Sequence, residues 1–183
     1  IVFTGVGKSA GELECAVALG LKAINVESAG ELARIEELAR STGRVARVAI
    51  RVNPDIDANS HPHISTGLKI NKFGIPSEAA RQLIASIPAR RCLKLVAVHV
   101  HVGSQITTIE PFRRAAAFLA GMAADCLRAG VNLEYLDAGG GLGIAYDLGA
   151  SVTAAEYART FVDEARPTGL PLVLEPGRAI VGA

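Results

Sequence analysis

Short apolar runs alternate with longer amphipathic segments from one end of the 183-residue chain to the other. Most of the apolar runs are continuous, which is typical of parallel strands that are buried on both faces. We predict six strands, at residues 1–4, 23–27, 45–53, 93–102, 133–137 and 171–175. We predict five helices between them, at residues 9–20, 28–41, 77–86, 111–129 and 153–165.

Two of these helices begin with the same signal, Ser9-Ala-Gly-Glu12 and Ser28-Ala-Gly-Glu31. Each has the pattern of a capping box, in which the serine caps the helix and the glutamate reaches back to the serine backbone. Ser9 also closes the segment Gly5-Val-Gly-Lys-Ser9, which looks like the end of a P-loop. Because Val2 stands where that motif needs its first glycine, we interpret the segment as a strand-to-helix turn.

The repeated strand–helix pattern leaves two architectures, an open doubly wound sheet and a (β/α)8 barrel. A complete barrel has eight strands and about 250 residues. Residues 1–183 would then form a single partial barrel domain with about six of the eight strands. One connection, residues 54–75, is long and polar, and long loops at strand ends are often functional in such folds.

Residues that can carry chemistry follow the carboxyl ends of the predicted strands. They are Arg51, His99, His101, Asp137, Glu175 and Arg178. In a barrel these strand ends converge on one mouth, where catalytic residues belong. Their shared placement therefore indicates a site more strongly than any one of them does.

The fifth strand is followed by Asp137-Ala-Gly-Gly-Gly-Leu-Gly143. Successive glycines allow backbone N–H groups to surround a phosphate, although a tight turn explains the same residues equally well. A dinucleotide-binding fingerprint does not fit, because Ile144 or Tyr146 occupies the position of its third glycine.

His99 and His101 are two residues apart, so on a strand they point to the same face. Three roles fit: metal ligands together with Asp137 or Glu175, packed core histidines, or an imidazole that lies flat against an aromatic cofactor. The next residues, Gly103-Ser104, suit a phosphate contact. His61 and His63 lie in the long connection and are interpreted as loop residues.

Glu175-Pro-Gly-Arg178 places a carboxylate, a rigid turn and a guanidinium in succession. The two charged groups could simply pair. Alternatively, Glu175 faces a heterocyclic nitrogen and keeps it protonated, while Arg178 binds a phosphate or a substrate carboxylate.

Composition narrows the function further. The formal net charge is +1 and the chain has no Trp, which gives no reason to expect binding to nucleic acid or to a membrane surface. The cysteines are Cys15, Cys92 and Cys126, a sparse and odd set that fits a reducing compartment, so we expect a cytoplasmic protein. No apolar run reaches membrane-spanning length. The chain opens on Ile1 in a strand, and we expect it to be a fragment.

Together these motifs resemble the barrel-type pyridoxal 5'-phosphate (PLP) dependent decarboxylases, the family of diaminopimelate, ornithine and arginine decarboxylases. The resemblance covers the whole chain and follows the family's order. It rests on Phe-Thr-Gly-Val-Gly-Lys-Ser at 3–9, Asn-Val-Glu-Ser at 25–28, Arg-Val-Asn-Pro at 51–54, His-Ile-Ser-Thr-Gly at 63–67, Asn-Lys-Phe-Gly at 71–74, His-Val-Gly-Ser-Gln at 101–105, Gly-Gly-Gly at 139–141 and Glu-Pro-Gly-Arg at 175–178. Ile-Ser-Thr-Gly and Gly-Ser-Gln favour the diaminopimelate branch.

The resemblance implies PLP as cofactor and a role for each matching residue. His101 would stack on the ring, and Glu175 would contact the pyridine nitrogen, which makes these two the catalytic candidates. Arg178 would sit at the phosphate and substrate-carboxylate end. The remaining cofactor-binding candidates are Ser104, Gly139, Gly140, Gly141 and Gly177, with Arg51 as a supporting residue below the ring. No metal ligand is expected.

The implied reaction is decarboxylation of meso-2,6-diaminopimelate to L-lysine by a homodimer. Ornithine, arginine and carboxynorspermidine decarboxylases are alternatives within the family. A non-catalytic homologue that binds PLP or a partner protein, and a metal-dependent barrel hydrolase, are alternatives of other classes. The family's Schiff-base lysine precedes Phe3 and its C-terminal β-domain follows the barrel. Since this chain contains neither, we expect it to be inactive alone.

Overall fold

The computed structural model describes residues 1–56, 73–146 and 151–182. Its strands are β1 (Val2–Phe3), β2 (Ala23–Val26), β3 (Ala46–Asn53), β4 (Ile75–Pro76), β5 (Leu93–His99), β6 (Tyr135–Asp137) and β7 (Leu172–Val173). Its α-helices are α1 (Ala10–Leu19), α2 (Ala29–Ser41), α3 (Ser77–Ser86), α4 (Glu110–Arg128), α5 (Ala154–Ala165) and α6 (Gly177–Val181). Short 3-10 turns, Ile87–Ala89 and Arg166–Thr168, follow α3 and α5.

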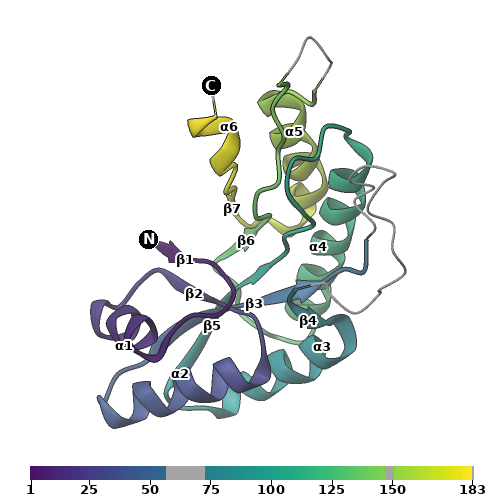
Figure 1. The fold of residues 1–183 in the computed structure, drawn as a ribbon. Helices are drawn as coiled ribbons and strands as arrows, with labels where there is room; N and C mark the ends of the chain where they lie inside the picture. The colour runs from purple at the N-terminus through teal and green to yellow at the C-terminus, as the bar shows by residue number, and fades with distance from the viewer. Residues whose placement is uncertain (57–72, 147–150, 183) are drawn as a thin grey trace.

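The order of the strands distinguishes between the two predicted architectures. Neighbours in the sheet follow the chain order β1-β2-β3-β5-β6-β7, and every pair is parallel. A doubly wound sheet reverses its strand order at a switch point, whereas a barrel does not. The prediction of a partial (β/α)8 barrel is confirmed, with the helices covering the outside of the curled sheet (Figure 1).

The curl of the sheet is visible in contacts between strands that are not neighbours. Asn25 in β2 and Asp137 in β6 are separated in the sheet by β3 and β5. Neighbouring strands lie about 4.8 Å apart, so these residues would be about 14 Å apart in a flat sheet. Instead, Asn25 Nδ2 lies 2.9 Å from Asp137 Oδ2. The inner face of the sheet is therefore closed enough for opposite strands to bond across it.

The apolar interior has two parts of different composition. The larger cluster lies between the sheet and the helices and contains large side chains such as Leu32, Ile50 and Phe112. The smaller cluster consists of Ala23, Ala49, Val96, Ala97 and Tyr135. These residues come from β2, β3, β5 and β6, and most are small because the inside of a barrel leaves little room.

Only one of the two predicted capping boxes is complete. Ser9 and Glu12 make both reciprocal bonds at the start of α1. At α2, Ser28 accepts from the Glu31 backbone, but the Glu31 carboxylate accepts from the backbone of Glu27 and pairs with Lys8. Glu31 is buried, and a buried carboxylate needs a cationic partner more than it needs a cap.

Other differences from the predicted elements are at their ends. The fourth predicted strand stops at His99 rather than continuing to residue 102, and the fifth begins at Tyr135. The two-residue strand β4 pairs with the end of β3, and the short helix α6 follows Pro176; the sequence pattern revealed neither. Most of the predicted long connection, including His61 and His63, lies outside the described residues. Within the described part of the chain, every helix is too short or too polar to span a bilayer.

Candidate functional site

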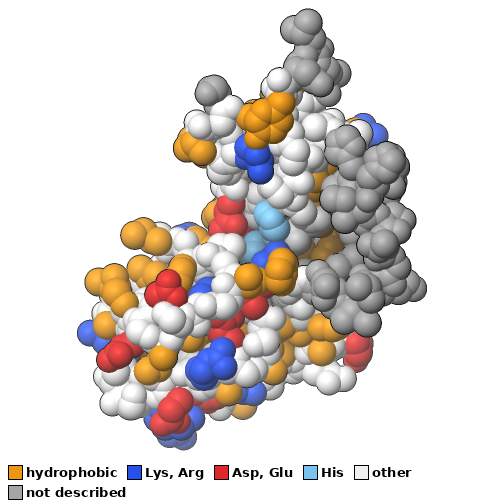
Figure 2. Space-filling model, in the orientation of Figure 1, with side chains coloured by type: hydrophobic (Ala, Val, Ile, Leu, Met, Phe, Trp, Pro, Cys, Tyr) orange, Lys and Arg blue, Asp and Glu red, His pale blue; other side chains and the backbone are white. Residues whose placement is uncertain are grey.

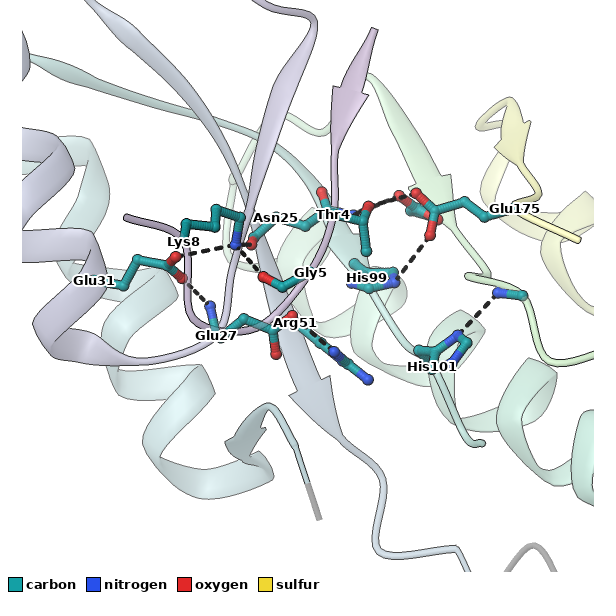
Figure 3. A network of polar contacts seen from close by, with 12 residues as sticks. Thr4, Gly5, Lys8, Asn25, Glu27, Glu31, Arg51, His99, His101 and Glu175 are labelled. Carbon is teal, nitrogen blue, oxygen red and sulfur yellow. Dashed lines mark hydrogen bonds and ion pairs between the residues drawn. The ribbon is translucent and has the colours of Figure 1, made fainter. Parts of the chain in front are cut away.

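Each of the strands β1, β2, β3, β5, β6 and β7 contributes one polar residue, in the strand or just after it, to the carboxyl end of the interior. These residues, called the mouth layer below, are Thr4, Asn25, Arg51, His99, Asp137 and Glu175. The close-up labels Thr4, Asn25, Arg51, His99 and Glu175 and shows their side chains coming from different strands (Figure 3). In the space-filling view, histidine atoms lie in a hollow between acidic and basic groups (Figure 2). The predicted convergence of the strand ends is therefore present in the structure.

A chain of hydrogen bonds joins four members of the mouth layer. The Thr4 hydroxyl donates to Glu175 Oε1 over 2.5 Å. The Asn25 side-chain amide donates to Thr4 Oγ1 over 2.8 Å and to Asp137 Oδ2 over 2.9 Å. Thr4 and Asn25 were not among the predicted site residues. Asn25 nevertheless carried a signal, because an amide inside a continuous apolar strand needs a buried partner.

Asp137 is fully buried and accepts a second hydrogen bond from the Gly139 backbone. Burial and the nearby Glu175 carboxylate raise the pKa of Asp137 to about 7, although the bonds from Asn25 and Gly139 oppose that shift. Asp137 can therefore hold a proton near neutral pH.

The two histidines occupy different environments. His99 is fully buried and its Nε2 lies 3.7 Å from Glu175 Oε2. His101 is half-buried and its Nδ1 accepts from the Gly140 backbone over 3.1 Å. Burial and the Arg51 charge lower the pKa of His101 to about 4 and that of His99 well below its ordinary value. Both imidazoles are therefore neutral at pH 7 and suit an apolar or aromatic neighbour.

The metal interpretation of the sequence combined His99 and His101 with Asp137 or Glu175, whereas the structure groups His99 with both carboxylates and leaves out His101. His99, Asp137 and Glu175 each offer a ligand atom, and these atoms lie within 4.8 Å of one another. Both Asp137 oxygens and Glu175 Oε1 already accept hydrogen bonds. The group thus resembles a polar network more than a prepared metal site, and His101 is engaged with Gly140 instead.

Arg51 forms a largely buried ion pair with Glu27, with 2.7 Å between Arg51 Nη1 and Glu27 Oε1. Glu27 was not a predicted site residue, although it lies in a segment that carried the family resemblance. Arg51 Nε and Glu27 Oε2 are buried and have no hydrogen-bond partner among the described residues. The pair places a fixed positive group near the histidines, which is one reason for their low pKa values.

The glycines after β6 are required by close backbone contacts. A Cβ atom added at Gly139 would lie 2.3 Å from the Val100 carbonyl oxygen, at Gly140 2.2 Å from that of Glu175, and at Gly141 2.5 Å from that of Gly103. Gly139 and Gly141 also have positive φ angles of 63° and 100°. The N–H groups of Gly139 and Gly140 donate within the protein. The segment is therefore a packed turn that brings three strand ends together.

Gln105 connects the loop after β5 to this glycine turn. Its side-chain amide donates to the Ile144 carbonyl oxygen and accepts from the Ile144 N–H. Gln105 has a φ of 56°, which is unfavourable for a residue with a Cβ atom, so the two bonds hold a strained conformation. Ser104 lies next to it and is exposed.

Arg178 does not pair with Glu175 in the structure. It donates to the Tyr146 hydroxyl, and its guanidinium carbon lies 6.0 Å from the centre of the Tyr146 ring. The Gly177 N–H donates to the Glu175 carbonyl oxygen over 2.8 Å and opens α6. Of the two readings of Glu-Pro-Gly-Arg, simple pairing is therefore wrong, and the Glu175 carboxylate remains turned toward the mouth layer.

Lys8 confirms that the P-loop-like segment is a structural turn. Its ammonium group is buried, donates to the carbonyl oxygens of Gly5 and Asn25, and pairs with Glu31 at 3.0 Å. A P-loop lysine would need to face a phosphate, whereas this one ties the turns after β1 and β2 together.

Comparison with protein families decides between the remaining interpretations. The family model described as "Pyridoxal-dependent decarboxylase, pyridoxal binding domain" matches residues 1–182. The chain belongs to this family. Motif residues 63–67 and 71–72, which contributed to the predicted resemblance, lie outside the described residues.

Several relatives of the chain are diaminopimelate decarboxylases. The chain is 41% identical over 181 residues to a diaminopimelate decarboxylase of Helicobacter pylori, covering 99% of this chain and 45% of that protein. It is also 41% identical to the diaminopimelate decarboxylase of Pseudomonas aeruginosa, again over 99% of this chain and 44% of that protein. The chain therefore spans a little under half the length of the curated relatives that it matches.

Solved structures of diaminopimelate decarboxylases also align with the chain over nearly its whole length. The crystal structure of the H. pylori enzyme complexed with L-lysine aligns with a TM-score of 0.91 at 42% identity, covering 98% of this chain and 46% of that one. Diaminopimelate decarboxylase from M. jannaschii aligns with a TM-score of 0.87 at 34% identity, covering 98% and 43%. A viral arginine decarboxylase, at 22% identity and a TM-score of 0.73 over 97% of this chain and 45% of that one, shares the fold.

The mouth layer suits the cofactor of this family. A protonated pyridine ring needs a carboxylate at its nitrogen, and Glu175 presents one that is half-buried and held by Thr4. A flat aromatic ring needs a neutral, partly accessible neighbour, and His101 is both. Arg51 Nε, a buried polar atom without a partner among the described residues, comes from β3, the neighbour of the strand that leads to His101. These features fit PLP.

Proposed function

We propose that this chain is the PLP-binding part of a diaminopimelate decarboxylase, which converts meso-2,6-diaminopimelate to L-lysine and carbon dioxide. The observation that carries the proposal is the Glu175 carboxylate, which Thr4 holds at the barrel mouth close to the neutral His101. The names of the relatives support diaminopimelate as the substrate.

Each residue of the site has a defined task in this proposal. His101 would hold the cofactor ring, and Glu175 would keep a proton at the ring nitrogen. Arg178 would bind the substrate carboxylate or the phosphate, and Arg51, held by its buried pair with Glu27, would support the ring. Ser104, Gly139, Gly140, Gly141 and Gly177 are the remaining residues proposed to lie around the phosphate. Because the N–H groups of Gly139, Gly140 and Gly177 donate within the protein, these three would hold the loop in place rather than donate to the phosphate.

The chemistry follows from the charges at the mouth. When bound, PLP supplies an electron sink for the pair of electrons that remains after carbon dioxide leaves. Glu175 keeps that sink effective because a carboxylate beside the ring nitrogen favours its protonated form. Because its low pKa keeps it neutral, His101 adds no charge at the mouth. Its imidazole would orient the ring.

We further propose that residues 1–183 act as one partial barrel domain within a cytoplasmic homodimer. The rest of the enzyme would supply the lysine that holds PLP and the C-terminal β-domain. Ornithine and arginine remain the competing substrates, because residues that measure substrate length are expected largely outside this segment.

The proposal is tested with the full-length enzyme of which this chain is a part. Release of carbon dioxide is measured with meso-diaminopimelate, L-ornithine and L-arginine, with and without added PLP. We expect PLP-dependent release with diaminopimelate that exceeds the other two by at least about a hundredfold in kcat/KM. Preference for ornithine or arginine would reassign the substrate within the family. Activity that needs stoichiometric zinc and no PLP would contradict the proposal.

A further inference from the structure

Glu175 is fixed in two separate ways. Its backbone N–H donates to the Gly139 carbonyl oxygen over 2.7 Å, and its own carbonyl oxygen accepts from Gly177. Its side chain is only half-buried and has several rotatable bonds, so backbone bonds alone do not aim the carboxylate. Within the described residues, the hydrogen bond to the carboxylate comes from Thr4, at the opposite edge of the sheet.

The direction of the hydrogen bonds behind Thr4 follows from donor and acceptor chemistry. The Glu175 carboxylate accepts and takes the single hydroxyl hydrogen of Thr4, so Thr4 must accept from the nitrogen of the Asn25 amide; the first hydrogen on that nitrogen faces Asp137 Oδ2. The second hydrogen on the same nitrogen points at Thr4 Oγ1. Thr4 therefore accepts from Asn25, and its single hydroxyl hydrogen is left for Glu175 Oε1.

The direction of these hydrogen bonds determines which oxygen of Glu175 is occupied. Its Oε1 atom is committed as an acceptor from Thr4, while Oε2 points toward His99 Nε2 at 3.7 Å, a distance that is too long for a hydrogen bond. Oε2 is therefore the oxygen that is free to bind a donor in the mouth (Figure 3). The Asn25–Thr4 pair decides which oxygen that is.

We propose that Thr4 is a positioning residue for Glu175 and that Asn25 is its anchor, so that Asp137, Asn25, Thr4 and Glu175 form a directional relay across the barrel. The relay aims Glu175 Oε2 at the ring nitrogen of the bound cofactor. This inference rests on the proposed role of Glu175 as the partner of that nitrogen. It assigns a positioning function to Thr4 and Asn25.

Two substitutions separate the hydroxyl of Thr4 from its packing. Thr4→Val keeps nearly the same shape and removes the hydroxyl, whereas Thr4→Ser keeps the hydroxyl and removes a methyl group. If Thr4 had a purely structural role, Thr4→Ser would also change the behaviour of the protein, because it removes the methyl group. A positioning role predicts that serine restores the wild-type behaviour and valine does not.

The first measurement needs no cofactor. In NMR spectra of the protein, both Asn25 side-chain amide protons are expected to exchange slowly with solvent in the wild type and in Thr4→Ser. In Thr4→Val, we expect one of them to exchange at least about tenfold faster, because its acceptor is gone. Equal protection of both protons in Thr4→Val would overturn the relay, whether or not the protein binds cofactor.

The second measurement follows the ring nitrogen. Pyridoxamine 5'-phosphate labelled with ¹⁵N at the ring is bound to each variant, since it cannot condense with surface lysines. We expect the bound nitrogen of Thr4→Val to lose its proton about one pH unit lower than in wild type and Thr4→Ser, a roughly tenfold weaker proton affinity. An unchanged or higher value in Thr4→Val would overturn the positioning role. Failure of the wild type to bind would instead refute the proposed function, and the amide protons would then decide on the relay.

Discussion

The two ends of the same strands are built in opposite ways. At the amino-terminal end, Glu134 accepts from Arg47 and pairs with Lys94 at 2.9 Å, and all three side chains are partly exposed. These bonds lower the pKa of Glu134 to about 2. Three residues later, at the carboxyl-terminal end, burial raises the pKa of Asp137 to about 7. Glu134, just before β6, and Asp137, at its end, thus have pKa values that shift in opposite directions.

The two ends of the strands also differ in how many buried polar atoms lack a hydrogen-bond partner among the described residues. Six buried side-chain atoms lack a hydrogen-bond partner among the described residues, and five of them belong to Asn25, Glu27, Arg51 and His99 at the mouth. Each such atom costs about 1–3 kcal/mol of stability. The amino-terminal end satisfies its charges with one another and with water. A protein retains unsatisfied groups where a ligand will use them, so the comparison locates function at the mouth.

The largest expected effect is on turnover. In the full-length enzyme, Glu175→Ala should reduce kcat by roughly a hundredfold or more, because a ring nitrogen without its carboxylate is a poorer electron sink. Affinity for PLP should change far less. The matched change at the other end, Lys94→Ala, should leave kcat within about twofold. Steady-state kinetics and PLP titration measure both, and unchanged turnover in Glu175→Ala would refute its role.

The next effect is on folding stability. Gly140→Ala places a Cβ atom 2.2 Å from the Glu175 carbonyl oxygen, so we expect a loss of about 2–3 kcal/mol in the free energy of unfolding. Gly121→Ala in α4 is the control, since no atom lies within 4 Å of its Cβ position; it should stabilise by about 0.5–1 kcal/mol. Denaturant titration gives both values. Equal effects would mean that the mouth glycines are not packed as described.

The opposite carboxylate shifts predict opposite pH dependences. The folded pKa of Asp137, about 7, lies above its ordinary 3.8, so its stabilisation is complete below pH 3.8 and is lost as the pH rises through 7. For Glu134 the pKa is lowered, so its stabilisation is present above 4.5 and is lost as the pH falls through about 2.

Single substitutions separate these two contributions. Asp137→Asn should gain several degrees of Tm relative to wild type between pH 5 and 8. The new amide can donate to Asn25 Oδ1 only after the Asn25 side chain flips, which also turns the Asn25 nitrogen away from Thr4 and breaks the relay, so this variant reports on stability and not on the relay. Glu134→Gln should lose its difference from wild type only in acid. Parallel Tm curves for wild type and Asp137→Asn would show that Asp137 titrates normally.

The smallest effect concerns Gln105, whose two hydrogen bonds to Ile144 join two loops at the mouth. Gln105→Gly relieves an unfavourable φ angle but removes both bonds to Ile144, so the free energy of unfolding should change by less than about 1 kcal/mol. Affinity for pyridoxamine 5'-phosphate should fall by roughly threefold to tenfold, because the adjoining loop that we propose to bind the phosphate loosens. Gln105→Glu should weaken binding more, since it adds negative charge beside the phosphate. Isothermal titration calorimetry measures the affinity of both variants.

Much of the fold could be predicted from the sequence because local signals carry it. Continuous apolar runs marked the parallel strands, and the placement of His101 and Glu175 at strand ends pointed to one mouth. Thr4 was missed because a threonine at the end of a β-rich run is unremarkable until the opposite edge of the sheet approaches it. The close contact of Gly140 with Glu175 likewise depends on the register of strands far apart in the chain. Such contacts exist only after the sheet has curled.

The most direct test of the account is the binding of pyridoxamine 5'-phosphate to this chain, measured by isothermal titration calorimetry with variants at both ends of the barrel. We predict saturable binding of one molecule per chain, weakened at least about tenfold by His101→Ala and unchanged by Arg47→Ala at the amino-terminal end. Absence of saturable binding, or equal sensitivity to the two substitutions, would contradict the placement of the cofactor at the mouth.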